Sequence, residues 1–134
     1  MNKIEHIGIA VNNLESSNEL FAKLLGTPHY KTEVVESEGV KTSFFRTGTS
    51  KIELLEATNQ DSPIAKFLSK KGEGVHHIAF DVDDIEKEIN RLKEEGFKVL
   101  NETPKKGADN KLVAFLHPKF TNGVLIELCQ EICE

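Results

Sequence analysis

The sequence has only two cysteines and no long apolar run, and both shortages narrow the classes of protein that fit it. Cys129 and Cys133 stand near the end of the chain without a nearby histidine, so they cannot close a zinc site, and a reducing compartment disfavours a disulfide between them. No apolar stretch approaches the roughly 18 residues that span a bilayer. The first residues lack the apolar segment of a signal peptide. These features predict a cytoplasmic protein with two free thiols.

Positive charge is also in short supply. The chain has 17 Lys and Arg against 22 Asp and Glu, for a formal net charge of -5. This balance argues against a nucleic-acid-binding surface. It leaves room for a small anionic ligand, because one local cluster of lysines suffices for that. At 134 residues, of which 38% are hydrophobic, the chain is predicted to be one domain with its own core.

An internal repeat is the main feature that is present. Residues 6–15 resemble residues 77–86, with His, Ile, Val and Glu at matching places. A second pair of similar segments, Ile52–Leu55 and Ile126–Cys129, follows in each half. Because several elements recur in the same order, the sequence is interpreted as a duplication.

Each half reads as strand, helix and three further strands. Asn or Asp precedes each apolar helical period and Gly follows it, as N-caps and C-caps require. Apolar residues at helical spacing indicate the two helices. They are Leu14, Leu20, Phe21, Leu24 and Leu25 in the first half, and Ile85, Ile89 and Leu92 in the second. The expected middle strands are Tyr30–Glu36 and Val40–Arg46 in the first half, and Lys98–Asn101 and Leu112–Leu116 in the second.

A further short helix is expected at Pro63–Lys71, with Ser62 as its N-cap and Gly72 as its C-cap. It joins the two halves. The predicted organisation is therefore a first module at about 1–60, a linker helix at about 61–73 and a second module at about 74–134.

The repeat places two histidines and two glutamates in equivalent positions. His6 corresponds to His77, and Glu53 corresponds to Glu127. A lone strand histidine is more often structural, but two repeat-related pairs are harder to dismiss. Two imidazoles and two carboxylates suit one divalent ion such as Co, Mn, Zn, Ni or Fe(II). With open coordination positions, such an ion acts as a Lewis acid for a bidentate substrate.

Very small residues share a strand face with the two histidines. Gly8 lies two places after His6, and Ala79 lies two places after His77, so each pair points to the same side. We expect these small residues to leave open space for a substrate cleft. His76 points to the other face, and His29 and His117 fall outside the repeat, so all three are expected to be structural.

This pattern resembles the vicinal-oxygen-chelate superfamily, and local stretches resemble its methylmalonyl-CoA epimerases over essentially the whole chain. Those stretches are 52–56, 61–68, 74–80, 115–119 and 123–128. The resemblance implies an α+β fold, in which two tandem βαβββ modules form a curved mixed sheet around a metal cleft with helices on its convex face. It also implies a cytoplasmic homodimer that uses one divalent ion, held by His6, Glu53, His77 and Glu127.

The implied reaction is interconversion of (R)- and (S)-methylmalonyl-CoA by removal of the C2 proton through a metal-stabilised enolate. Glu127 matches the family carboxylate beside the metal, which makes it the first candidate for a base. Some relatives carry a second glutamate on the strand after the Gly-Val pair, where this chain has Thr42 near the expected place in the cleft. Glu36, Glu38, metal-bound water or a single mobile carboxylate remain alternatives for the second role. Lysines expected to meet the anionic coenzyme A are Lys105, Lys106, Lys111 and Lys119.

Two other functions stay open on the same scaffold. A glyoxalase I-type lyase would use the same four ligands for a different substrate. A non-catalytic small-molecule (drug) binding protein would need the concave sheet but no metal, and the four metal-competent residues count against it.

Overall fold

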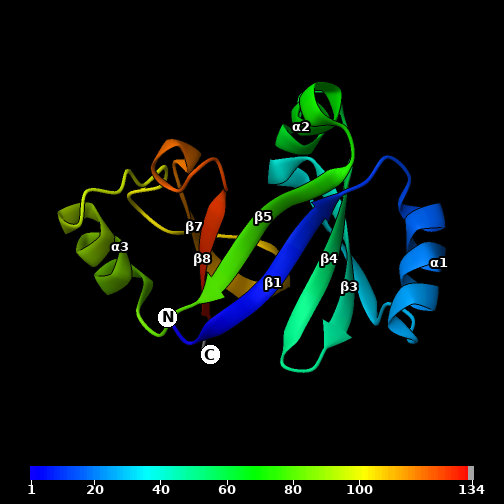
Figure 1. The fold of residues 1–134 in the computed structure, drawn as a ribbon, viewed down its shortest axis with the longest axis horizontal. Coiled ribbons are helices and arrows are strands. Elements are labelled where there is room, and N and C mark those ends of the chain that lie inside the picture. Colours follow the sequence, from blue (N-terminus) through cyan, green and yellow to red (C-terminus); the bar gives the residue numbers. More distant parts are fainter. Residues whose placement is uncertain (133–134) are drawn as a thin grey trace. The chain divides into compact units, whose positions relative to one another are not determined.

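The computed structural model describes residues 1–132, so Cys133 lies outside the described residues (Figure 1). The chain forms two compact units. The first, called the N-terminal unit, comprises residues 6–76. The second, called the C-terminal unit, comprises residues 77–132 of the described chain together with residues 1–5. The linker helix therefore belongs to the N-terminal unit. None of the described helices is long and apolar enough to cross a membrane.

The N-terminal unit contains four strands in the order β2-β3-β4-β1 and two α-helices. β1 is parallel to β4, whereas β2, β3 and β4 are antiparallel neighbours. Its elements are β1 (Lys3–Ala10, from residue 6 on), α1 (Leu14–Leu25), β2 (Lys31–Val35), the 3₁₀ turn η1 (Glu36–Glu38), β3 (Val40–Thr47), β4 (Ser50–Ala57) and α2 (Pro63–Lys71).

The C-terminal unit repeats this plan with its strands in the order β5-β8-β7-β6. β5 is parallel to β8, and the remaining neighbours are antiparallel. Its elements are β5 (Gly74–Asp81, from residue 77 on), α3 (Ile85–Glu94), β6 (Lys105–Lys106), the 3₁₀ turn η2 (Ala108–Asn110), β7 (Lys111–Leu116), the 3₁₀ turn η3 (Pro118–Phe120) and β8 (Ile126–Glu131).

Equivalent hydrogen bonds hold the first helix of each unit. The Leu14 N–H donates to Glu56 Oε2 at 2.7 Å, and the Ile85 N–H donates to Gln130 Oε1 at 2.8 Å. Glu56 and Gln130 each stand three places after the repeat glutamate of the last strand. The predicted side-chain caps are confirmed as well: Asn13 accepts from the Ser16 N–H, Asp84 from the Lys87 N–H and Ser62 from the Ala65 N–H. The two units therefore share a plan down to single hydrogen bonds.

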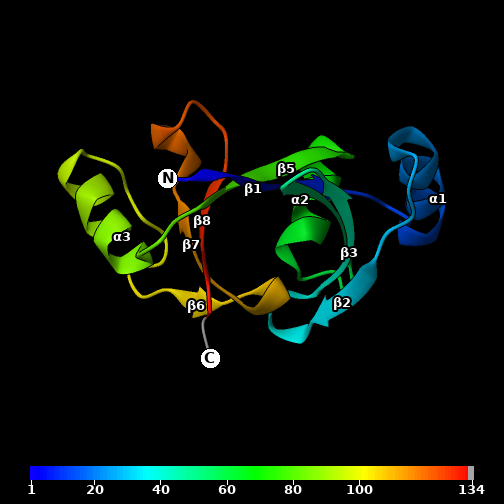
Figure 2. The same ribbon diagram turned by 90° about the horizontal axis from the view of Figure 1, so that it is seen from below.

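Helices cover both faces of the strands in the N-terminal unit. On one face, α1 packs through Leu14 and Phe21 against Phe45 and Leu54. On the other face, α2 packs through Ile64 against Leu55 and its neighbours. Figure 2 shows α1 and α2 on opposite sides of β3. In the C-terminal unit, α3 covers one face with a core that includes Ile85, Ile89, Leu92, Ala114, Leu116 and Leu128.

The apolar face of α1 differs from the prediction. Leu20 is 62% exposed and Leu24 is 70% exposed, so these two residues do not belong to the core. The helix instead packs through Leu14, Phe21 and Leu25, which are spaced seven and four residues apart and lie along one side. Leu20 and Leu24 lie on a neighbouring stripe of the helix, which faces solvent and not the sheet. For α3, by contrast, burial of Ile85, Ile89 and Leu92 is confirmed.

The prediction of a strand at Lys98–Asn101 is wrong. Val99 forms only an isolated bridge to Leu116, and the strand beside β7 is the two-residue β6. The Asn101 side chain accepts a hydrogen bond from the Phe115 N–H at 3.0 Å. Because this side chain takes a donor of β7, a regular backbone ladder cannot continue through the segment.

Candidate metal-binding and active site

A buried histidine–glutamate pair lies on one face of the N-terminal unit. His6 Nδ1 lies 3.1 Å from Glu53 Oε2, and both side chains are 6% exposed. His6 is on β1 and Glu53 is on the parallel strand β4. Leu55, two residues after Glu53, lies under α2. Because residues two apart share a strand face, the pair lies on the side that α2 partly covers and not on the side of α1.

A matching pair lies in the C-terminal unit. His77 Nε2 on β5 lies 3.1 Å from Glu127 Oε1 on β8, with side chains 7% and 8% exposed. The Phe115 ring packs edge-on against the His77 ring, with centroids 6.0 Å apart. The other carboxylate oxygen of Glu127 accepts a hydrogen bond from the Cys129 thiol at 3.4 Å. In each unit the structure thus brings one histidine and one glutamate of the repeat together; that all four hold one metal ion stays a prediction.

The geometry of each pair fits adjacent ligands of a metal ion. Bonds of roughly 2.0–2.2 Å from a metal to nitrogen and oxygen, set at right angles, put the two ligand atoms about 3.0 Å apart. The observed separation is 3.1 Å in both pairs. The same distance also suits a hydrogen bond. Buried imidazole and carboxylate groups are nonetheless the donor set that a divalent transition metal prefers.

The small residues lie directly across from the two carboxylates. Gly8 is the cross-strand partner of Glu53, and Ala79 is the partner of Glu127. A larger side chain at either position would enter the space in which the carboxylate reaches its histidine. The structure therefore supplies a second reason for small residues here, besides the predicted cleft. That Gly8 and Ala79 line a substrate cleft stays a prediction.

Replacement of Ala79 by valine is expected to destabilise the fold. Ala79 has no exposed surface and packs with Val113, Cys129 and Phe115. Added methyl groups in such a packed place typically cost about 1–3 kcal/mol of unfolding free energy. Urea unfolding of Ala79→Val against the parent measures this loss. A variant as stable as the parent that loses activity would instead place the substrate in front of Ala79.

Thr42 lies on the same strand face as Glu53, two strands from β1. It is 1% exposed and is the cross-strand partner of both Leu55 and Glu33. Its place in the substrate cleft stays a prediction. Glu33, which the sequence analysis did not consider, is at a strand position that shares the face of Thr42, and its carboxylate lies 3.8 Å from Lys31 Nζ. The two-residue alternation of β2 and β3 is the signal that could have identified it.

The four lysines expected to bind coenzyme A are spread over the C-terminal unit. Lys105 and Lys106 form β6, and Lys111 begins β7 beside them. Lys111 is only 12% exposed, and its ammonium group lies 4.0 Å from the buried carboxylate of Glu5. Lys119 follows the far end of β7 in η3, several residues away at about 3.3 Å per residue. They do not form one compact cluster.

The other three histidines make packing contacts. The His29 ring meets Phe45 edge-on, and the His76 ring meets Phe67. His117 accepts a hydrogen bond from the Lys119 N–H at 3.1 Å and begins η3. These contacts agree with the structural roles expected for them.

Comparison with known proteins extends this interpretation. A model of the Glyoxalase/Bleomycin resistance protein/Dioxygenase superfamily matches residues 5–115. The ethylmalonyl-CoA/methylmalonyl-CoA epimerase of Cereibacter sphaeroides is 42% identical over 96% of this chain and 97% of its own.

Solved structures agree with the sequence relatives. Methylmalonyl-CoA epimerase of Streptomyces coelicolor in complex with 2-nitronate-propionyl-CoA superposes with a TM-score of 0.92 at 37% identity, covering 99% of this chain and 96% of that chain. A methylmalonyl-CoA epimerase in complex with methylmalonyl-CoA and NH4+ has the same TM-score, identity and coverage. The α+β fold of two tandem βαβββ modules is thereby confirmed, and this chain belongs to the glyoxalase, bleomycin resistance protein and dioxygenase superfamily.

Proposed function

We propose that this protein is an isomerase that interconverts the two C2 epimers of methylmalonyl-CoA. The observation that carries the proposal is the pair of buried His–Glu contacts at 3.1 Å in repeat-related positions. Relatives named as epimerases of methylmalonyl-CoA align over nearly the whole chain. The substrate is thus a short branched acyl group carried on coenzyme A.

We propose further that His6, Glu53, His77 and Glu127 together hold one divalent ion. Each pair is buried, and each contains one nitrogen and one oxygen donor at a separation that suits neighbouring ligands. This donor set suits Co, Mn, Zn or Ni. Such an ion supplies Lewis-acid stabilisation of the negative charge that develops next to C2.

The chain's own residues would then move the C2 proton. The C2–H bond lies between a thioester carbonyl and a carboxylate, so its electrons can pass to the thioester oxygen as the proton leaves. A carboxylate oxygen of Glu127 accepts that proton. Its orientation is held by the two contacts described above, to His77 and to Cys129. Return of a proton to the opposite face of C2 gives the other epimer.

A second proton carrier is needed on that opposite face. Thr42 is near the strand place at which some relatives are expected to carry a glutamate, and Glu33 is its cross-strand partner. Glu36 and Glu38 belong to η1, outside the strands. The face that carries Glu53, Thr42 and Glu33 is therefore the first place to seek the second group.

The test is exchange of the C2 hydrogen of methylmalonyl-CoA in heavy water. Proton magnetic resonance should show loss of the C2 signal on addition of the protein. Parallel reactions with a glutathione hemithioacetal test the lyase alternative. Turnover of the hemithioacetal without C2 exchange would overturn the epimerase proposal.

A homodimer and a cytoplasmic location complete the proposal. Light scattering should give about twice the 15.0 kDa chain mass, and a monomeric mass would reject the dimer. Lys105, Lys106 and Lys119 remain proposed contacts of coenzyme A. Lys111 is the weakest of the four, because Glu5 already lies beside it.

A further inference from the structure

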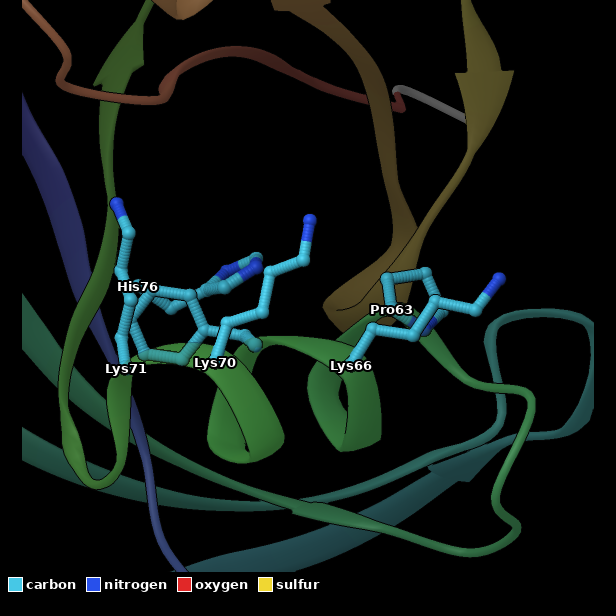
Figure 3. A pocket seen from close by; sticks show the side chains of 6 residues that line it. Pro63, Lys66, Lys70, Lys71 and His76 are labelled. Atoms are coloured by element: carbon cyan, nitrogen blue, oxygen red, sulfur yellow. The ribbon is translucent and has the colours of Figure 1, made fainter.

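Lys111 is the one lysine in the described part of the C-terminal unit that is not exposed. Its side chain is 12% exposed. The lysines of α2 are of the ordinary kind: Figure 3 shows the side chains of Lys66, Lys70 and Lys71 projecting from the helix, and all three are exposed. Because lysine is rarely withdrawn from water unless it is paired, Lys111 is expected to act inside the fold and not at its surface.

The side chain of Lys111 lies on the same sheet face as the His77–Glu127 pair. Lys111 is the cross-strand partner of Glu131, and Phe115 is the partner of Glu127. Residues two apart on a strand share a face, so Lys111 and Glu127 point to the same side. They are four residues apart along the strands, about 13 Å at 3.3 Å per residue. A molecule on this face can therefore meet Glu127 at one end and the long side chain of Lys111 at the other.

A series of short contacts leads from the Lys111 ammonium group to Glu127. Lys111 Nζ lies 4.0 Å from Glu5 Oε2, and the Glu5 side chain is 3% exposed. A carboxylate oxygen of Glu5 lies within 4.8 Å of Cys129 Sγ. The Cys129 thiol lies 3.4 Å from Glu127 Oε2. Glu5 therefore holds the ammonium group in the buried part of the unit, beside the proposed base and not at the rim of the sheet.

The ammonium group of Lys111 keeps its donors available for a ligand. A separation of 4.0 Å from Glu5 allows an ion pair, but it exceeds the roughly 2.7–3.2 Å of an N–H···O hydrogen bond. Within residues 1–132, the Lys111 ammonium group has no closer contact with a carboxylate. An ammonium group carries three N–H donors. Lys111 can thus present an N–H group to a substrate while Glu5 balances its charge.

The proposed reaction lacks a second proton carrier, and Lys111 meets that need. Thr42 brings no carboxylate to the other unit, and Glu33 is 34% exposed with Lys31 Nζ 3.8 Å away. Lysine is among the side chains that act as general acid and base. We infer that Lys111 is the second proton carrier of the epimerisation, opposite Glu127. This inference rests on the proposed function for its reaction.

The step balances in protons and electrons. Glu127 takes the C2 proton from one face, and the electrons of the C2–H bond pass to the thioester oxygen. Lys111 then gives a proton from an N–H bond to the other face of C2, and the electrons return from oxygen to form the new C2–H bond. Glu127 ends protonated and Lys111 ends as a neutral amine, ready to act as the base in the reverse direction.

The experiment follows each epimer separately with Lys111→Gln in heavy water. Conversion to the other epimer should fall by at least roughly 10²-fold, the usual contribution of a positioned acid or base. The epimer whose C2 hydrogen faces Glu127 should still gain deuterium, without inversion and within tenfold of the parent rate. Proton magnetic resonance measures the exchange, and chiral analysis of the recovered acid measures the inversion. A purely structural or binding role of Lys111 would lower both rates together.

Arginine separates proton transfer from charge. Lys111→Arg keeps the positive charge, but arginine is not deprotonated in proteins, so this variant should lose epimerisation as Lys111→Gln does. The matched control is Lys87→Gln, at an exposed lysine of α3, which should behave as the parent. Glu5→Gln/Lys111→Gln removes the carboxylate that the single variant leaves buried, and it should show the same loss of inversion if Lys111→Gln fails to fold.

The outcomes distinguish this inference from the proposed function. Parent protein that epimerises, with a Lys111→Gln or Lys111→Arg variant that epimerises at the parent rate, would overturn the role of Lys111 alone. Equal loss of exchange and inversion in a folded Lys111→Gln variant would overturn it as well. Parent protein that neither exchanges nor inverts methylmalonyl-CoA would reject the epimerase and this inference with it.

Discussion

Glu127→Gln is expected to lower the rate of C2 exchange by roughly 10²–10⁴-fold, the usual contribution of a positioned general base. Glutamine keeps the size of the side chain and one carbonyl oxygen, but it cannot accept the proton. The surroundings should tolerate it, because glutamine fills the same volume and the Cys129 thiol can donate to its carbonyl oxygen as it does to the carboxylate. The measurement is the initial rate of deuterium incorporation at C2, with the metal content of each sample determined alongside.

The matched control is Glu131→Gln, the exposed glutamate at the end of the same strand. It makes the same chemical change without touching the buried pair, so its exchange rate should equal that of the parent. Full activity in Glu127→Gln would remove Glu127 from the proton-transfer step. Loss of activity together with loss of the metal would assign it to binding the ion.

Removal of the metal should abolish epimerisation and leave the fold largely intact. The apolar clusters under α1 and α3 contain none of the four proposed ligands, so the helices do not depend on the ion. A chelator should reduce C2 exchange at least a hundredfold, which corresponds to about 2.7 kcal/mol of transition-state stabilisation. Far-UV circular dichroism should stay unchanged, and added Co or Mn should restore the rate.

The double variant His6→Ala/His77→Ala tests the same site through the amount of metal that the protein binds. Elemental analysis should find less than a tenth of the parent's metal content. One full equivalent of metal in this variant would contradict the assignment of His6 and His77 as metal ligands. Global unfolding on chelation would show instead that the ion has a structural role.

The sequence determined much of the local structure because its signals act over short distances. Asn13, Ser62 and Asp84 cap helices where they were expected. The middle strands of the first half lie within a residue or two of their predicted bounds. The equivalence of His6 with His77 and of Glu53 with Glu127 was also predicted from the duplicated strand pattern, and their strands pair in matching registers.

Other features depended on which surfaces meet in the folded chain. Leu20 and Leu24 fit the helical period as well as Phe21 does, but only packing decides which stripe is covered, and these two are exposed. The strand expected at Lys98–Asn101 failed because the side chain of Asn101 took the Phe115 N–H, a contact between residues far apart in sequence.

For the candidate site, too, the sequence predicted some features and the tertiary structure decided others. By itself the sequence determined that His6 is equivalent to His77 and Glu53 to Glu127, since the repeat and the strand alternation are local patterns, and its resemblance to known proteins indicated the family. Only the tertiary structure decided that Gly8 and Ala79 lie across from the carboxylates, and that Leu20 and Leu24 of α1 are exposed. Each of these depends on strand register or on the rotation of a helix about its axis. Both are fixed by burial of apolar surface across the fold and not by neighbouring residues alone.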